Sequence, residues 1–245
     1  MKLVLNIWRQ ASAADGGRFV RYLVDGIPPS YSLLEAFDVL NARLLASGQV
    51  PVAFESDCRE GICGACGVVV EGHAHGGRPL TTSCELRVSA FVDGAELTIE
   101  PFRARAFPVL RDLIVDRSAL DRVIGAGGYV SVRTGSAPEA NVIPVAKPAA
   151  DEALDAAACI GCGACVAACP NASAALFVGA KVTHLALLPQ GAPERKARAL
   201  ALVAAADREG FGACSSYGEC HAACPKGISL GVITRMNREL LRGAS

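Results

Sequence analysis

The chain lacks an apolar run long enough to cross a membrane. The best candidate, residues 197–206, is short and follows three charged residues, whereas a spanning helix needs about 20 apolar residues. Residues 1–9 also hold too short an apolar stretch for a signal peptide. We therefore expect a protein of a reducing, cytoplasmic compartment that reaches a membrane only through a partner.

Net charge and an obvious reaction centre are also missing. The 245 residues include 24 Lys and Arg and 24 Asp and Glu, so the formal charge is zero. No basic excess indicates a nucleic-acid partner. Neither a nucleophile–base pair nor paired carboxylates with a site around them can be recognised. The chain itself is thus expected to carry out no bond chemistry on a substrate.

Cysteine, by contrast, is abundant, with eleven residues. A disulfide framework does not suit a chain this long and apolar, and an odd number leaves one thiol unpaired. Clustered cysteines in a reducing compartment usually bind metal or take part in redox chemistry. The spacing of the cysteines therefore carries the functional information.

Residues 1–106 predict a small α+β domain. A helix is expected at 32–45, because Ser32 and Glu35 fit a capping box ahead of one apolar stripe. The stripe consists of Leu33, Phe37, Leu40 and Leu44. Strands are expected at 2–9, 18–25, 67–71 and 96–100. Two strands, a helix and further strands are the order of a β-grasp domain.

Residues 107–245 predict a second, all-α domain. An irregular connector is expected up to about residue 150, since this stretch contains Pro138, Pro144 and Pro148. The sequence beyond it is rich in alanine, which favours helices. Helices are expected at 172–188, 194–209 and 230–241, with the cysteines in the loops between them.

The first cysteine group has the spacing of a plant-type 2Fe–2S ferredoxin. Its members are Cys58, Cys63, Cys66 and the distant Cys84. Glycines at 61, 64 and 67 are expected to permit unusual dihedrals and to let amides approach the sulfurs. A zinc site is the alternative, but zinc ribbons favour two close cysteine pairs.

The second group matches the bacterial dicluster run, in which the fourth cysteine ligates the other cluster. It consists of Cys159, Cys162, Cys165 and Cys169, followed by Pro170, and its mate is Cys214, Cys220 and Cys224. On the same template, Tyr217 replaces the missing cysteine. Cross-ligation then gives a 4Fe–4S set of Cys159, Cys162, Cys165 and Cys224, and a three-thiolate set of Cys169, Cys214 and Cys220.

The three-thiolate set predicts a 3Fe–4S cluster. The alternative is a second 4Fe–4S cluster whose labile iron binds water or Tyr217. Four, four and three thiolates use all eleven cysteines.

These motifs resemble the iron–sulfur subunit of succinate dehydrogenase and fumarate reductase. The resemblance rests on CREGICGAC at 58–66, CIGCGAC at 159–165 and CPKGI at 224–228, and it covers nearly the whole chain. Residues 157–173 and 188–191 resemble the branch whose membrane anchor is a single cytochrome b chain.

The resemblance implies a role in electron transfer. In this family a flavoprotein subunit oxidises succinate at FAD, and electrons pass through 2Fe–2S, 4Fe–4S and 3Fe–4S clusters to a quinone, often menaquinone in this branch. The implied place is peripheral, on the cytoplasmic face of the inner membrane, held by the anchor subunit. Two familiar quinone-site residues, a tryptophan and a histidine, are replaced by Ala174 and Ser215. Only Pro170 and Tyr217 are then candidates for a place near the quinone.

Three other functions stay open. The same wiring serves fumarate reduction, because direction depends on cluster potentials. A subunit of another flavoprotein-linked oxidoreductase, such as a thiol:fumarate type, is disfavoured, since such chains usually carry further cysteine motifs beyond residue 230. A zinc-stabilised assembly module is the third.

Among the histidines, His73 and His75 are expected in an exposed hairpin tip, while His221 either donates to a cluster sulfur or lies near the ligands by chance.

Overall fold

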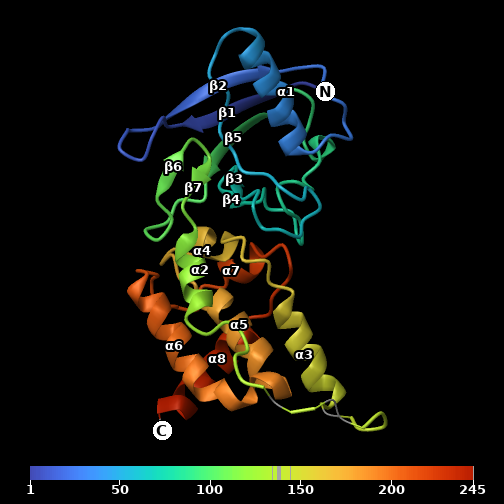
Figure 1. The fold of residues 1–245 in the computed structure, drawn as a ribbon. Helices are drawn as coiled ribbons and strands as arrows, with labels where there is room; N and C mark the ends of the chain where they lie inside the picture. The colour runs from blue at the N-terminus through green and yellow to red at the C-terminus, as the bar shows by residue number, and fades with distance from the viewer. Residues whose placement is uncertain (134, 137–138, 144, 245) are drawn as a thin grey trace.

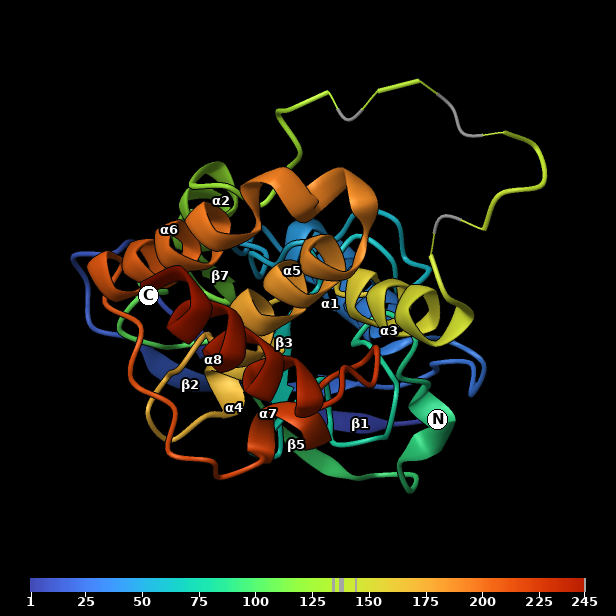
Figure 2. The ribbon, with the colours of Figure 1, turned by 90° about the horizontal axis from the view of Figure 1, so that it is seen from below.

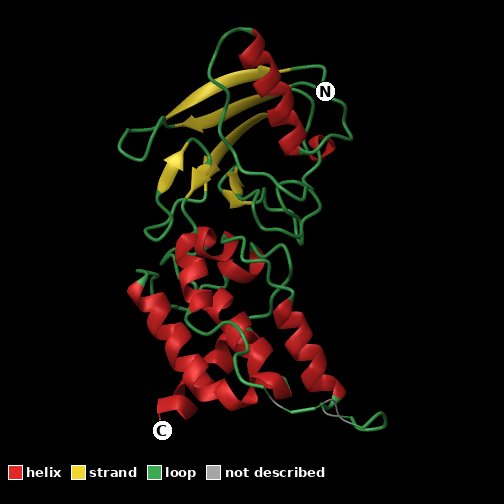
Figure 3. Cartoon of the chain, in the orientation of Figure 1, coloured by secondary structure: helices red, strands yellow, loops and turns green. Residues whose placement is uncertain are grey.

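The computed structural model describes residues 1–133, 135–136, 139–143 and 145–244, and it shows a sheet-containing half above a helical half (Figures 1 and 3). The α+β fold class is confirmed. Two of the prolines expected in the connector, Pro138 and Pro144, lie outside the described residues.

The N-terminal half is a five-stranded mixed sheet with the strand order β2-β1-β5-β3-β4. Its strands are β1 (Leu3–Arg9), β2 (Arg18–Val24), β3 (Val68–Val70), β4 (His73–Ala74) and β5 (Glu96–Pro101). β1 pairs antiparallel with β2 and parallel with β5, while β3 pairs antiparallel with β5 and β4. The parallel β1–β5 pair at the centre of the sheet is the β-grasp arrangement that the sequence predicts.

Helix α1 (Leu33–Ala46) covers this sheet. The capping box is present: Ser32 Oγ accepts the Glu35 amide at 3.3 Å, and the Glu35 carboxylate accepts the Ser32 amide at 2.6 Å. The predicted stripe is buried against the strands. Local sequence signals therefore fix both the start of α1 and the face it buries.

The C-terminal half is helical. It contains α2 (Ser118–Gly125), α3 (Lys147–Ala157), α4 (Ala164–Ala168), α5 (Ala175–Leu187), α6 (Arg195–Arg208), α7 (Glu219–Ala222) and α8 (Gly231–Ala244). A short 3₁₀ segment, Pro189–Glu194, lies between α5 and α6, and another, Val88–Ala90, lies in the N-terminal half. α5 lies at the centre, packed against α3, α6 and α8 (Figure 2). It is apolar on nearly all sides, as a buried helix must be. Within the described residues, no helix combines the length and apolar character needed to cross a bilayer.

The stretch 107–150 holds more structure than the irregular connector that its prolines predict. A two-stranded hairpin forms from β6 (Val109–Arg111) and β7 (Ile114–Val115), and α2 follows it. Pro148 lies in the first turn of α3, where its missing amide costs no hydrogen bond. This proline therefore begins a helix.

The β6–β7 hairpin contacts both halves. Leu113 packs in the N-terminal core, whereas Phe107 and Val115 pack in the helical core. The buried Asp112 accepts hydrogen bonds from Arg9 Nε at 3.0 Å and from the Ala53 amide at 2.8 Å. The hairpin thus joins the two halves, and the domain boundary at residue 106 stays a prediction.

The ion pair between α6 and α8 predicts a large loss of stability on mutation. Glu239, whose side chain is 1% exposed, pairs with Arg195 and Arg242. Glu239→Gln should lower the free energy of unfolding by roughly 1.5–3 kcal/mol, because it removes the charge of a buried carboxylate that accepts hydrogen bonds from Arg195. The matched control is Glu152→Gln, which removes the more exposed pair with Arg235 and should cost less than about 1 kcal/mol. Thermal unfolding midpoints of the two variants measure both losses. Equal shifts would contradict a larger stabilising role for the buried Glu239 than for Glu152.

Candidate functional site

The first cysteine group lies in the loop that precedes β3 and in the segment around Cys84. Cys63 is exposed and Cys58 half-buried, whereas Cys66 and Cys84 are buried. Amides of residues 60, 62 and 63 donate to Cys58 Sγ at 3.3–3.4 Å, and the Ala65 amide donates to Cys63 Sγ at 3.4 Å. Such donors stabilise sulfur that carries negative charge.

Two of the three predicted glycines of this loop adopt positive φ. Gly61 has φ of 69° and Gly64 of 76°, which lets the chain curl around the sulfurs. The prediction of an unusual dihedral at Gly67 is wrong. A Cβ on Gly67 would lie 2.5 Å from the Phe102 ring, so this glycine is needed for close packing.

The pKa values of two thiols in this group are shifted in opposite directions. Hydrogen bonds from the Glu60 amide and its neighbours lower the pKa of Cys58 to about 7. Burial raises the pKa of Cys66 to about 12. The buried thiol needs a bound cation to ionise, while the outer one is already close to its thiolate form.

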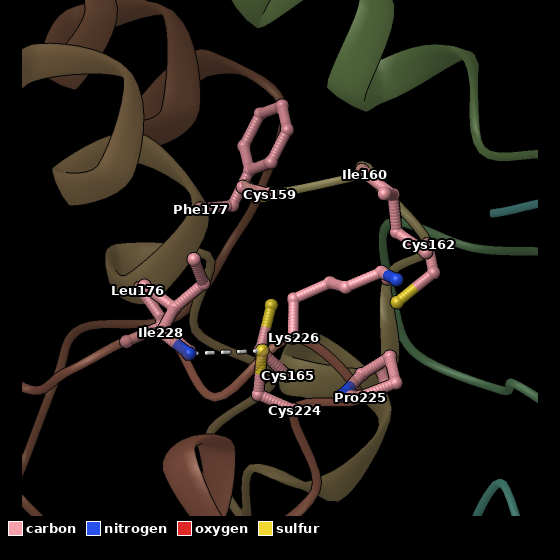
Figure 4. A pocket seen from close by; sticks show the side chains of 13 residues that line it. Cys159, Ile160, Cys162, Cys165, Leu176, Phe177, Cys224, Pro225, Lys226 and Ile228 are labelled. Atoms are coloured by element: carbon pink, nitrogen blue, oxygen red, sulfur yellow. Dashed lines mark hydrogen bonds between the residues drawn. The ribbon is translucent and has the colours of Figure 1, made fainter. Parts of the chain in front are cut away.

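The second set lines one cavity (Figure 4). Its sulfur-bearing residues are Cys159, Cys162, Cys165 and Cys224. The first three come from the loop into α4, and Cys224 comes from the turn after α7. The Ile228 amide donates to Cys224 Sγ at 3.5 Å, the dashed line in Figure 4. The fold therefore brings together the four cysteines that cross-ligation predicts.

The residues around this cavity suit an iron–sulfur cluster. Leu176, Phe177 and Ile228 supply apolar walls. Burial raises the pKa of Cys162 to about 12 and that of Cys165 well above its ordinary value. Thiols that are held neutral and gathered around one void become thiolates when iron replaces their protons. Among the described residues, no three His, Cys, Asp or Glu side chains are arranged for a single metal ion.

The third set lines a separate hollow. It brings Cys169, Cys214 and Cys220 together with Tyr217. Tyr217 is 58% exposed and Cys214 is exposed, so this group is accessible from the surface. Pro170 is exposed but does not line the hollow.

Asn171 is a site residue that the sequence analysis missed. Its amide nitrogen donates to Ala213 O at 2.9 Å and to Ser215 Oγ at 2.8 Å. A Cβ on Gly212 would lie 1.8 Å from Asn171 O, so only glycine allows the two loops to close. Asn171 thereby ties the loop of Cys169 to the loop of Cys214. Its place directly after the Cys-Pro pair was the available signal.

The prediction that His75 is exposed is wrong. Its side chain is 1% exposed and lies edge-on to Phe102 at 5.2 Å. The Ser83 amide donates to His75 Nδ1 at 3.2 Å, which leaves the ring proton on Nε2, an atom with no hydrogen-bond partner in the described chain. Burial lowers the pKa of His75 to about 4, and the nearby Arg117 cation adds to the effect. His221 Nδ1 lies 2.8 Å from Ile228 O and donates to this carbonyl.

Family comparisons agree with this geometry. Residues 4–122 match a 2Fe-2S iron-sulfur cluster binding domain, and residues 155–228 match a 4Fe-4S dicluster domain. The succinate dehydrogenase iron-sulfur subunit of Bacillus subtilis is 31% identical over 77% of this chain and 72% of its own length. The chain belongs to the family of succinate dehydrogenase and fumarate reductase iron–sulfur subunits.

Other members of this family show the same relationship. The fumarate reductase iron-sulfur subunit of Mycobacterium tuberculosis is 32% identical over 72% of the chain and 69% of its own length. A subunit of the CoM/CoB fumarate reductase of Methanothermobacter marburgensis is 29% identical over 81% of the chain, which spans only 36% of that relative. A solved structure, the Mycobacterium smegmatis Sdh1 complex in the apo form, has the same fold. It has a TM-score of 0.71 and 22% identity, and the match covers 100% of this chain and 98% of that one.

The burial of His75 predicts a pH-dependent loss of stability. Because its folded pKa is about 4 and its ordinary value 6.5, the folded protein favours the neutral ring. This contribution is complete above pH 6.5 and is lost as pH falls towards 4. Between pH 6.5 and 5 the loss should be roughly 2 kcal/mol. Thermal unfolding of the wild type and His75→Gln across pH 7.5–5 measures it, and parallel curves would contradict the burial of a neutral ring.

Proposed function

We propose that this chain is the electron-transfer subunit of a succinate:quinone oxidoreductase. The observation that carries the proposal is the gathering of all eleven cysteines into three successive groups in a member of this family. We assign a 2Fe–2S cluster to Cys58, Cys63, Cys66 and Cys84. A 4Fe–4S cluster is assigned to Cys159, Cys162, Cys165 and Cys224, and a 3Fe–4S cluster to Cys169, Cys214 and Cys220. The β-grasp domain is taken as residues 1–106 and the all-α domain as 107–245.

The residues of the chain hold these groups in sequence. Iron–sulfur clusters take up and release single electrons, with potentials set by hydrogen bonds, charge and burial. The loop of the first group contacts the loop of the second, because a Cβ on Gly64 would lie 2.6 Å from Ile160 O. Cys165 lies in the first turn of α4 and Cys169 directly follows this helix. A five-residue helix thus separates the second group from the third, so each group neighbours the next along the chain.

The two ends of this series suit two partners. Ile62, 60% exposed beside the exposed Cys63, is proposed to face the flavoprotein that holds FAD. The open hollow at Tyr217 is proposed to face the membrane anchor, of the cytochrome b type, with a quinone, menaquinone in our assignment, near Tyr217 and Pro170. Ser215, at a familiar quinone-site position, accepts a hydrogen bond from Asn171 within the chain. This internal bond supports a quinone that is held mainly by the anchor. The complex is proposed to lie on the cytoplasmic face of the inner membrane.

Tyr217 determines the cluster type in the third group. It lies with the three cysteines where the dicluster template has a fourth ligand. Tyr217→Cys should therefore convert the site from three-iron to four-iron binding, with loss of the sharp low-temperature EPR signal of an oxidised 3Fe–4S cluster. Tyr217→Phe, which adds no thiol, is the control and should keep this signal. Loss of the signal in Tyr217→Phe would support a tyrosine-ligated 4Fe–4S cluster, and an unchanged Tyr217→Cys spectrum would contradict the template.

Purification of the intact complex tests the function. We expect a flavoprotein and a membrane anchor to copurify with this chain, and succinate to bleach the visible absorbance of its clusters. Any quinone that copurifies should be reduced to quinol when succinate is added. A colourless preparation, or clusters that succinate leaves oxidised, would contradict the proposal and favour a zinc-stabilised assembly module or another flavoprotein-linked oxidoreductase.

Fumarate reduction is the second candidate, since the Mycobacterium tuberculosis relative named as a fumarate reductase subunit is 32% identical. Because the same clusters serve both directions, the complex itself must be assayed with succinate plus quinone and with fumarate plus quinol. The proposal predicts the higher turnover with succinate, and the reverse ratio would assign the chain to fumarate reduction.

A further inference from the structure

Arg117 joins the loops of the first two cysteine groups. It lies at the start of α2, and its side chain is 21% exposed. Its Nη1 donates to Gly64 O at 2.5 Å and to Cys162 O at 3.1 Å. Its Nη2 donates to Glu55 Oε2 at 3.0 Å, which holds the guanidinium in place. One side chain thus binds a carbonyl in each loop, one from each half of the molecule.

The two loops touch where Arg117 binds them. A Cβ on Gly64 would lie 2.6 Å from Ile160 O and 3.2 Å from Cys162 Cα. Gly163 packs beside Arg117 Cδ, since a Cβ there would lie 3.7 Å from that atom and 2.9 Å from the Phe107 ring. The contact therefore has no space for a larger residue, and Arg117 supplies its polar tie.

Arg117 also brings positive charge to this junction. A surface hollow between Cys63 and Cys159 is lined by Arg117, Asp121 and Lys181. Arg117 Nη1 binds the carbonyl of Cys162, and Lys181 lines the same hollow as Cys159. His75 is buried as the neutral ring in the same region. Two cations therefore lie near Cys162: Arg117, which binds its carbonyl, and Lys226, which lines the same cavity.

We propose that Arg117 is a positioning residue, which fixes the spacing between the 2Fe–2S and 4Fe–4S clusters and raises the potentials of both. The inference rests on the cluster assignment of the proposed function. Electron transfer slows steeply with distance, so a tie between the two loops sets the rate between them. A nearby cation stabilises the more negative, reduced state of a cluster, and the effect is strong where solvent is excluded.

Three variants separate spacing from charge. Arg117→Lys keeps the cation but cannot reproduce the forked contacts with two carbonyls and Glu55. Arg117→Gln removes both the cation and the fork. Lys181→Gln removes a cation near Cys159. Lys181 makes no hydrogen bond or ion pair with the described residues, so this variant leaves the hydrogen bonds of Arg117 intact. All three are to be made in the assembled complex.

Two readouts are needed besides activity. EPR-monitored redox titration gives the midpoint potential of each cluster, and the relaxation enhancement between the two reduced clusters reports their spacing. Arg117→Lys should weaken the enhancement and keep the potentials. Arg117→Gln should weaken the enhancement and lower both potentials. Lys181→Gln should lower only the 4Fe–4S potential.

A glycine pair tests the spacing without a change of charge. Gly64→Ala places a Cβ against Ile160 O and should push the loops apart, which weakens the relaxation enhancement. Gly72→Ala is the control, because Gly72 has the same φ of 76° and nothing within 4 Å of its Cβ. It imposes the same backbone strain and should leave the enhancement unchanged.

The outcomes distinguish this inference from the proposed function. If Arg117→Gln keeps the wild-type potentials and relaxation enhancement, the role of Arg117 is overturned, while three clusters in the wild type still support electron transfer. A wild-type complex without the clusters contradicts the proposed function itself. If Arg117→Gln fails to assemble, Arg117→Lys and Glu55→Gln decide, since both loosen the tie and should weaken the enhancement. Unchanged enhancement in both would equally overturn the proposal.

Discussion

The structure depends on one constraint: several sulfurs must meet at one point, although neighbouring thiolates repel one another and burial disfavours their charge. The chain meets it in two ways. At the outer loop, backbone amides point at Cys58 Sγ and lower the pKa of that thiol. In the dicluster half, Cys162 and Cys165 are held neutral in an apolar cavity. Bound iron offsets the cost of ionising them, so folding and cluster binding support each other.

The same constraint shapes the helical half. Cys224 lines the cavity of Cys159, Cys162 and Cys165, and α7, which precedes it, packs against α4. Cys169 and Cys214 meet only because Asn171 and Gly212 bring their loops together. The second and third groups are therefore parts of one folding unit. The first group belongs to another core, and the contact of Gly64 with Ile160 and Cys162 connects it to this unit.

Sequence reasoning succeeded where the cause is local. The capping box and stripe of α1, the curl at Gly61 and Gly64 and the cysteine spacings all depend on neighbours in the chain. It failed where the cause is distant. His75 looked like an exposed loop residue, but its ring packs against Phe102. Arg117 showed no motif, because its carbonyl partners lie 53 and 45 residues away.

The central claim is that three clusters lie at three successive cysteine groups. Anomalous diffraction at the iron edge from crystals of the assembled complex tests it most directly. The account predicts three separate iron peaks: one beside Cys58, Cys63, Cys66 and Cys84, one in the cavity of Cys159 and Cys224, and one beside Cys169, Cys214 and Cys220. Fewer than three peaks, or iron that joins Cys169 to the cavity of Cys159, would contradict it.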